Sequence, residues 1–518
     1  MAPPSPCRRR RVAVVARREI DWRRLSFAAT QGVNCRTRRR MTITPDADSA
    51  MRGMDRMAHG VVSRIPPLLL AHRRLDTFSS NVFIVFTVKA ISTVVGMATG
   101  ILVARSLGPT GKGSYALITT LPALVFCLVH LGVAEANVYF LRKQTHQMDP
   151  AVIRGNTMAF TILISGFTVA TLLLLKPYLC STFLSELPDI YFYIILLLVP
   201  FFLFDTFGSS LLVAFEQFKL LSAINLALRF VDTFVVVAVL YIFDLGLMGV
   251  VLAYLLYFVL KSAAFFLVGF WRQPIRRIPD LRSMYSSIKF GLKSHAQSLT
   301  GVLHYKIDIY ILALFLTPGD IGYYSIAVAL VSLIFYIPDV VGHVMYPKVA
   351  SLNEKDAHLF TAQTCRNTLF VTILPAAGII VFGRFLIRLL YGQEFLPATS
   401  ALYLLMPGTI TMCLYKILTR NFTSRNRQEL TVFAGLFGLL INVGLNLMLI
   451  PRMGIAGAAL ATSISYSSTS ILLLFFFLRQ SGIRAKDSLF INGSDISAIV
   501  QTGQSIVFPH KIKPRVQV

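Results

Sequence analysis

The chain carries a long succession of apolar stretches between Phe78 and Arg479, each about 20 residues long. About 20 apolar residues in a helix are enough to cross the hydrocarbon core of a bilayer. None of the stretches alternates as a membrane strand does, and the gaps between them are short. We therefore predict an all-α polytopic membrane protein with about twelve transmembrane helices. The predicted spans are 81–104, 114–134, 156–178, 190–214, 221–243, 247–271, 294–316, 322–346, 366–390, 399–417, 430–450 and 455–478.

The composition supports this class and excludes others. The 518 residues include 50 Lys and Arg against 24 Asp and Glu, which gives a formal net charge of +26. Such a charge by itself suggests a nucleic-acid partner. However, only 14% of the residues are charged and 55% are apolar, whereas ordinary soluble domains are roughly a quarter charged. A soluble enzyme, a disordered protein and a nucleic-acid binder are therefore excluded.

Much of the positive charge lies in a short region at the start of the chain. The first 75 residues contain 17 Arg, no Lys and five acidic residues, and they contain no stretch long enough to span a bilayer. We interpret residues 1–75 as a disordered basic tail, or as the result of a start codon assigned too early. Four later methionines precede the first predicted span: Met41, Met51, Met54 and Met57.

The remaining charge predicts the orientation of the helices. If the N-terminus is cytoplasmic, the loops on that side carry 17 Lys and Arg. The opposite loops and adjoining helix ends carry six: Arg105, Lys112, Lys176, Arg384, Arg388 and Arg452. Loops rich in Lys and Arg stay on the cytoplasmic side. We therefore predict that both termini are cytoplasmic.

Two short motifs occur twice at nearly the same offset. Residues 107–115 and 316–324 both read L-x-P-x-x-x-G-x-Y, displaced by 209 residues, and residues 246–253 and 454–461 share G-x-x-G-x-x-L-A, displaced by 208. An offset of six helices keeps both halves in one orientation, related by an axis along the membrane normal. The repeat predicts two six-helix lobes around a central cavity. The predicted domains are an N-lobe (76–271), a cytoplasmic linker (272–290), a C-lobe (291–480) and a cytoplasmic tail (481–518).

These motifs resemble a known family. The segment Ile101–Tyr115, the segment Leu131–Asn137, the segment from Lys306 to Tyr324 and the segment from Asn446 to Thr462 are similar to polysaccharide-biosynthesis flippases of the Wzx type. These belong to the multidrug/oligosaccharidyl-lipid/polysaccharide exporter superfamily, and the resemblance covers roughly residues 78–480. It implies a MATE-like fold.

The resemblance also implies a function. It implies a transporter, not an enzyme, in a bacterial inner membrane. This transporter would flip an undecaprenyl-pyrophosphate-linked oligosaccharide from the inner to the outer leaflet by alternating access, for synthesis of O-antigen, capsule or exopolysaccharide. Implied partners are the lipid-linked oligosaccharide, membrane lipids, a polysaccharide polymerase and a chain-length regulator, with no nucleic acid. The alternative is a cation-coupled multidrug or organic-cation antiporter of the same superfamily.

Polar residues inside the predicted spans are the candidate site residues, because ionisable groups in a bilayer are costly and usually face a cavity. Lys and Arg can stabilise a pyrophosphate, so we predict Lys89, Arg229 and Lys306 as substrate-binding cations. Carboxylates suit coupling to H+ or Na+, with no other cofactor. The candidates for ion coupling or for a polar cavity are Asp308, Asp232, Asp205 and His304.

Structural alternatives remain open for these residues. Arg229 and Asp232, three residues apart on one helix face, can form a buried ion pair. Asn442 and Asn446, together with Gly435 and Gly438, fit helix packing. The six cysteines are scattered without metal-ligand spacing. We predict no metal site and no catalytic residue.

Overall fold

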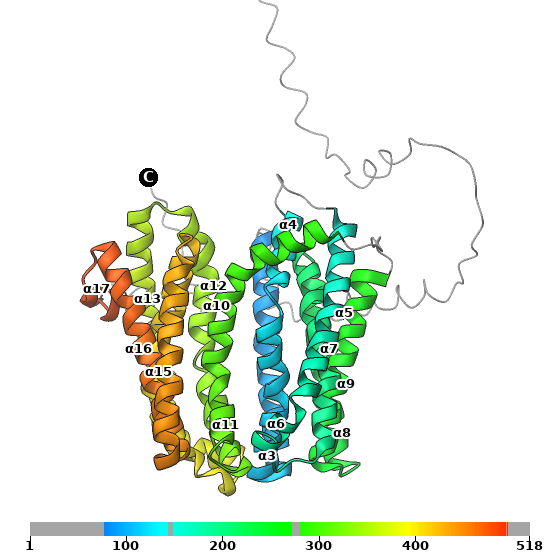
Figure 1. Ribbon diagram of the computed structural model, residues 1–518. Helices are drawn as coiled ribbons and strands as arrows, with labels where there is room; N and C mark the ends of the chain where they lie inside the picture. The colour runs from blue at the N-terminus through cyan, green and yellow to red at the C-terminus, as the bar shows by residue number, and fades with distance from the viewer. Residues whose placement is uncertain (1–76, 143–148, 272–279, 494, 496–518) are drawn as a thin grey trace, which may run out of the picture. The chain divides into compact units, whose positions relative to one another are not determined.

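The computed structural model describes residues 77–142, 149–271, 280–493 and 495. The predicted basic tail, 1–75, lies outside this part of the chain. Every regular element that is described is a helix (Figure 1). In the first half these are α3 (Thr77–Val129), α4 (Val133–Arg142), α5 (Pro150–Leu174), α6 (Lys176–Thr182), α7 (Asp189–Ala214), α8 (Phe218–Tyr241), α9 (Gly246–Phe266) and the π-helical turn η2 (Leu267–Trp271).

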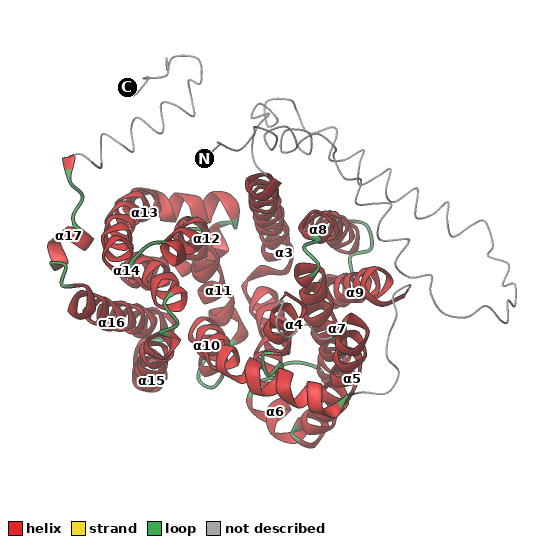
Figure 2. Ribbon diagram, turned by 90° about the horizontal axis from the view of Figure 1, so that it is seen from above, coloured by secondary structure: helices red, strands yellow, loops and turns green. Residues whose placement is uncertain are grey.

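The second half repeats this arrangement of long helices. It contains α10 (Leu281–Ala313), α11 (Pro318–Ser332), α12 (Tyr336–Ser351), α13 (Glu354–Leu390), the short 3-10 helix η3 (Gln393–Phe395), α14 (Ala398–Ser424), α15 (Gln428–Met453), α16 (Ile455–Ser481) and α17 (Ala485–Leu489). Seen from above, α3–α9 lie on one side and α10–α16 on the other (Figure 2). We call these groups the N-lobe and the C-lobe.

Nine of the described helices are long and apolar enough to cross a membrane. The pair α11 and α12, bent by 42° at a short break, makes a tenth span. Two features account for the difference from the twelve predicted spans. Helix α3 contains two of them, separated by a non-helical Gly108, and α10 is too polar to pass because it carries residues such as Lys306 and Asp308. The predicted fold class, an all-α polytopic membrane protein, is confirmed.

The repeated L-x-P-x-x-x-G-x-Y motif forms a reciprocal contact between the lobes. A methyl group placed on Gly113 of α3 would overlap the carbonyl oxygen of Pro318 in α11, and one on Gly322 would overlap the carbonyl oxygen of Pro109. Each motif thus packs its glycine against the proline of the other copy. Such self-complementary contacts arise where a twofold axis relates two surfaces, so the sequence repeat corresponds to a structural pseudo-symmetry.

The second repeated motif forms equivalent turns in the two lobes. Gly246 ends the turn between α8 and α9 with φ of 53°, and Gly454 lies between α15 and α16 with φ of 58°. Positive φ of this kind costs glycine little, since it has no Cβ. The repeated glycine therefore stands in both halves where the turn needs a positive φ.

Helix α10 begins inside the segment predicted as the inter-lobe linker, 272–290. Its first residue is Leu281, and the Asp280 side chain caps it by accepting hydrogen bonds from the backbone N–H groups of Arg282 and Ser283. Asn156 of α5 holds the backbone of Asp280 through two hydrogen bonds. The start of this C-lobe helix is therefore anchored on the N-lobe, because an N-cap residue satisfies the free N–H groups of the first turn.

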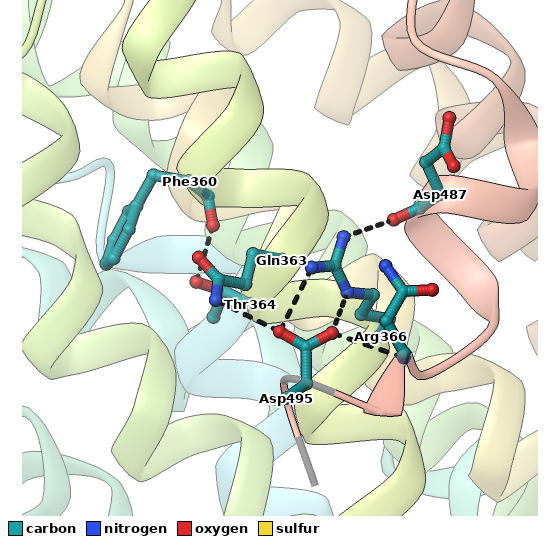
Figure 3. A network of polar contacts seen from close by, with 7 residues as sticks. Phe360, Gln363, Thr364, Arg366, Asp487 and Asp495 are labelled. Atoms are coloured by element: carbon teal, nitrogen blue, oxygen red, sulfur yellow. Dashed lines mark hydrogen bonds and ion pairs between the residues drawn. The ribbon is translucent and has the colours of Figure 1, made fainter. Parts of the chain in front are cut away.

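The described part of the predicted tail, 481–518, packs against the C-lobe. The Asp495 carboxylate accepts two hydrogen bonds from the Arg366 guanidinium of α13, at 2.6 and 3.1 Å, and one from Gln363 (Figure 3). Arg366 also donates to the backbone carbonyl of Asp487 in α17. A bidentate Arg–carboxylate pair fixes geometry as well as charge, so this segment is bound to α13.

Candidate transport site

Asp308 lies at the centre of a polar network in the C-lobe. Its carboxylate accepts hydrogen bonds from the hydroxyl groups of Thr462 (2.7 Å) and Tyr324 (2.9 Å) and from the amide of Asn446 (2.8 Å). Asn446 also donates to the Oδ1 atom of Asn442. These residues come from α10, α11, α15 and α16. We call the group formed by Asp308, Tyr324, Asn442, Asn446 and Thr462 the C-lobe carboxylate site.

This site is buried and holds no opposite charge. Asp308 is 3% exposed, and within the described residues it makes no ion pair. The Oδ1 atom of Asn446 is also buried and lacks a hydrogen-bond partner there. Neutral donors stabilise a carboxylate without cancelling its charge, and an uncompensated charge in a bilayer is costly. The site therefore has the chemistry to take up a proton or a small cation.

The two asparagines show what the sequence interpretation missed. It favoured helix packing for Asn442 and Asn446, but both belong to the network around Asp308. The packing interpretation does hold for Gly438, where a side chain would overlap Thr469. The available signal was the spacing of two amides four residues apart inside an apolar span, which places them on one helix face.

His304 lies on the same helix as Asp308 but bonds to a different partner. Its Nε2 atom is 2.7 Å from the Ser465 hydroxyl, which donates its own proton to the carbonyl oxygen of Gly438. The hydroxyl therefore accepts from His304, and Nε2 carries the proton. His304 is 2% exposed and its ring packs edge-on against Tyr466. These contacts hold the His304 side chain of α10 against α15 and α16.

The N-lobe contains two carboxylates that are each paired with a cation. Arg229 and Asp232 of α8 are 3.1 Å apart, as the structural alternative predicted, and Lys261 of α9 is 3.1 Å from Asp205 of α7. Both cations lie 5.5 Å from the centre of the Tyr257 ring, an arrangement that stabilises positive charge. We call these five residues the N-lobe ion-pair cluster.

The three predicted substrate-binding cations do not form one group. The Arg229 guanidinium packs beside Gly96 of α3, where a Cβ atom would lie 3.5 Å from its Cζ. Lys89 is seven residues earlier on α3, about 10 Å along the helix. It is exposed. Lys306 is exposed on α10 in the other lobe. The described residues give neither lysine an ion pair.

A further ion pair was not predicted from the sequence. Lys416 of α14 is 2.8 Å from Asp339 of α12, with its ammonium 4.8 Å from the centre of the Phe335 ring. Lys416 lies inside α14. Only the packing of α12 against α14 brings the two charges together.

Within the described residues, no group of three or more His, Cys, Asp or Glu side chains could hold a metal ion.

A protein-family model described as polysaccharide biosynthesis protein matches residues 102–400. This range is more than half of the 518 residues. The chain belongs to this family. Among curated proteins, the chain is similar to a probable low-salt glycan biosynthesis flippase of Haloferax volcanii. The two are 24% identical over 229 residues, which are 43% of this chain and 48% of the relative. The chain spans about half or less of the length of the curated relatives it matches.

The fold of the chain is similar to the folds of solved structures. The lipid II flippase MurJ in an inward closed conformation matches with a TM-score of 0.64 and 17% identity, over 83% of this chain and 93% of that one. An inward-facing multidrug resistance MATE family transporter of the MOP superfamily matches with a TM-score of 0.62 and 14% identity, over 77% and 98%. The resemblance drawn from the motifs is confirmed for the family and for the MATE-like fold.

Proposed function

We propose that this protein flips a lipid-linked oligosaccharide across the membrane by alternating access of its two lobes. The observation that carries the proposal is the placement of charged side chains inside both lobes of a MATE-like membrane fold. A lipid-linked sugar pyrophosphate brings dense negative charge into a low-dielectric path, where Lys and Arg stabilise it. Family membership and the similarity to a glycan flippase and to the fold of a lipid II flippase support the same function.

The finer assignment is also part of the proposal. The cargo is an undecaprenyl-pyrophosphate-linked oligosaccharide that moves from the inner to the outer leaflet of a bacterial inner membrane, for O-antigen, capsule or exopolysaccharide synthesis. Both termini are cytoplasmic, and a polysaccharide polymerase and a chain-length regulator are its partners. The protein acts as a transporter, not as an enzyme.

We assign the substrate phosphates to Lys89, Arg229 and Lys306. Arg229 is the best supported, since its side chain is about one-third exposed even while it is paired with Asp232. It can therefore offer further donors to an anion without breaking that pair. The exposed lysines suit the approach of a headgroup along the lobes.

We assign ion coupling to the C-lobe carboxylate site. Uptake of H+ or Na+ would neutralise Asp308, and the unpartnered Oδ1 atom of Asn446 supplies a second oxygen beside it. The same uncompensated carboxylate supports the second candidate function, antiport of an organic cation. The two candidate functions predict different results when the protein is absent: lipid-linked glycan accumulates if it is a flippase, and cells become sensitive to drugs if it is an antiporter.

Deletion of the gene and complementation tests the proposal. Loss of the protein should leave lipid-linked glycan on the cytoplasmic side, measured by labelling glycan in intact and permeabilised cells. Lys89→Ala, Arg229→Ala and Lys306→Ala should each reduce export at equal expression, because each removes a phosphate-binding charge. Lys355→Ala, an exposed residue at the start of α13, is the control. Normal export by all three variants would contradict the cation assignment, and drug sensitivity without glycan accumulation would favour the antiporter.

A further inference from the structure

The two lobes meet at both ends of the second half of α3. From Pro109 to Val129 this segment is about 30 Å long at 1.5 Å per residue. At its first end lies the reciprocal contact of Gly113 and Gly322. At its other end, the loop after α3 meets the first half of α10, where a Cβ atom on Gly291 would lie only 2.5 Å from the carbonyl oxygen of Gly132. The backbones of the two lobes are therefore in direct contact there.

A histidine pair lies at this second contact. The Nε2 atom of His130, in the loop after α3, is 3.3 Å from the Nδ1 atom of His295 in α10. The backbone N–H of Gly132 donates to the Nδ1 atom of His130 at 3.1 Å. That nitrogen is therefore an acceptor, and the proton of His130 is on Nε2, from which it is donated to His295. We call this pair the histidine latch.

The latch requires both imidazoles to be neutral. A proton added to His130 would go to Nδ1 and face the Gly132 N–H, so that two donors oppose each other. A proton added to His295 would go to Nδ1 and face the Nε2–H of His130, with the same result. If His130 moved its proton from Nε2 to Nδ1, it could accept a hydrogen bond from protonated His295. Its Nδ1–H would then oppose the Gly132 N–H. Either protonation therefore costs the latch one of its two hydrogen bonds, either the bond between the lobes or the bond by which the Gly132 N–H orients the His130 ring.

The surroundings offer one acidic group. Both histidines are buried, at 4% and 7% exposure, and Phe126 stacks on the His130 ring with a centroid distance of 4.8 Å. In the first turn of α4, Glu135 is close enough to His295 to interact with it electrostatically, and its Oε2 atom is buried without a hydrogen-bond partner among the described residues.

The other titratable groups nearby do not oppose this arrangement. In α3, the Cys127 thiol donates to the carbonyl oxygen of Leu299 at 3.8 Å. In α10, Lys289 is exposed. Beside the latch, the stacked rings of Tyr139 and Phe290, with centroids 4.0 Å apart, add an uncharged contact between the lobes.

We infer that the histidine latch is a proton-sensitive gate. It holds the lobes together at this end while both rings are neutral, and it opens when either ring takes up a proton from the solvent. The imidazolium that forms then pairs with the Glu135 carboxylate. This inference rests on the proposed function only in that the lobes must separate at this end during transport.

The experiment measures the separation of the lobes and not export, so its failure is distinct from failure of the flippase proposal. Spin labels are attached to cysteines that replace Lys219 in α8 and Lys355 in α13, both exposed, in full-length protein whose native cysteines are replaced by alanine. Distances are measured by double electron–electron resonance. Once the lobes separate and solvent reaches the rings, each histidine has an ordinary pKa and goes from about 3% protonated at about pH 8 to about 90% at about pH 5.5, which favours the open state. The longer-distance population should therefore grow several-fold on acidification.

Three variants decide the result. His130→Gln/His295→Gln, which cannot titrate here, should show the same distance distribution at both pH values. His295→Gln alone provides a milder test in case the double variant does not fold, and its pH response should be reduced. His358→Gln, which removes a buried C-lobe histidine that packs edge-on against Phe477, should respond as the parent does. A parent that does not respond to pH, or a double variant that responds fully, would overturn the inference.

Discussion

In the N-lobe, Asp205 and Asp232 each bind a cation of their own lobe, whereas Asp308 in the C-lobe is surrounded by hydroxyl and amide groups. All three carboxylates are buried. The difference is in how the charge is balanced. An ion pair inside a lobe is complete without a ligand, and removing one partner leaves the other unpaired. A carboxylate among neutral donors can still gain a proton or a cation.

This comparison separates two roles. The N-lobe ion-pair cluster can meet an anionic cargo through Arg229, whose side chain is partly exposed, while its carboxylates keep the cations in place. The C-lobe carboxylate site can respond to an ion. The pseudo-symmetry of the fold therefore does not extend to its charges, since the two lobes share turns and packing motifs but hold different chemistry.

The largest expected effect is that of Asp308→Asn. The substitution keeps the size of the side chain but removes its charge, so the site can no longer exchange a proton or a cation. The rate of export in complemented cells should fall at least tenfold at unchanged expression. This corresponds to an increase of about 1.4 kcal/mol in the activation free energy of transport. Asp232→Asn, in a carboxylate that is already paired, should reduce export less. Equal losses from the two substitutions would remove the distinction between the lobes.

The second prediction concerns stability. Lys261→Met leaves Asp205 buried without its cation, and removing one partner of a buried pair should lower the free energy of unfolding by about 3 kcal/mol. Asp205→Asn/Lys261→Met should recover most of this loss, because neither charge remains. The measurement is denaturant unfolding in detergent followed by fluorescence. Lys355→Met, which removes an exposed charge, is the control. Additive losses in the double variant would show that the pair is not coupled.

The smallest expected effect is at the docked C-terminal segment. Its Asp495 lies outside the predicted spans, and the hydrogen bonds from Arg366 hold the pKa of this carboxyl below its usual range. Asp495→Asn should weaken the contact by about 1.5 kcal/mol, the value of a typical charged hydrogen bond. Hydrogen exchange of the segment 485–493 should then be roughly ten times faster, without a change in the N-lobe.

The pH dependence of that contact has a definite sign. A carboxylate whose folded pKa is lowered contributes stability above its unfolded pKa, near 3.9, and loses it as the pH falls through the folded value. The protection of this segment, which compares its exchange rate with the rate of an unprotected chain at the same pH, should therefore be constant across neutral pH and fall only in acid below about pH 4. A change between neutral and mildly acidic pH would contradict the assignment to Asp495.

Much of the fold was predictable from local patterns. The apolar stretches predicted the helices because a bilayer requires every backbone group to bond within its own segment. The repeat predicted two equivalent lobes, and Gly113 and Gly322 lie where these lobes touch. The first two predicted spans are both present and form one element, α3, kinked at Gly108. Only α10 is less apolar than a count of apolar lengths suggested, because it carries polar residues such as Lys306 and Asp308.

The candidate site was predictable only as a set of residue types. Helical spacing placed Arg229 beside Asp232, because three residues make about one turn. It could not place Lys261 beside Asp205 or Asn446 beside Asp308, which are 56 and 138 residues apart in sequence. It also did not identify His130 and His295 as partners.

The sequence by itself therefore determined the membrane class, the duplication and the inventory of charged groups, since these depend on hydropathy, repeated motifs and composition. The tertiary structure decided which buried carboxylates are paired with a Lys or Arg and which is surrounded by neutral hydrogen-bond donors. That depends on helices packing across long sequence separations, where a few ångströms decide between an ion pair, a hydrogen-bonded carboxylate and a histidine pair between lobes. The same residue types can therefore give three different sites in one fold.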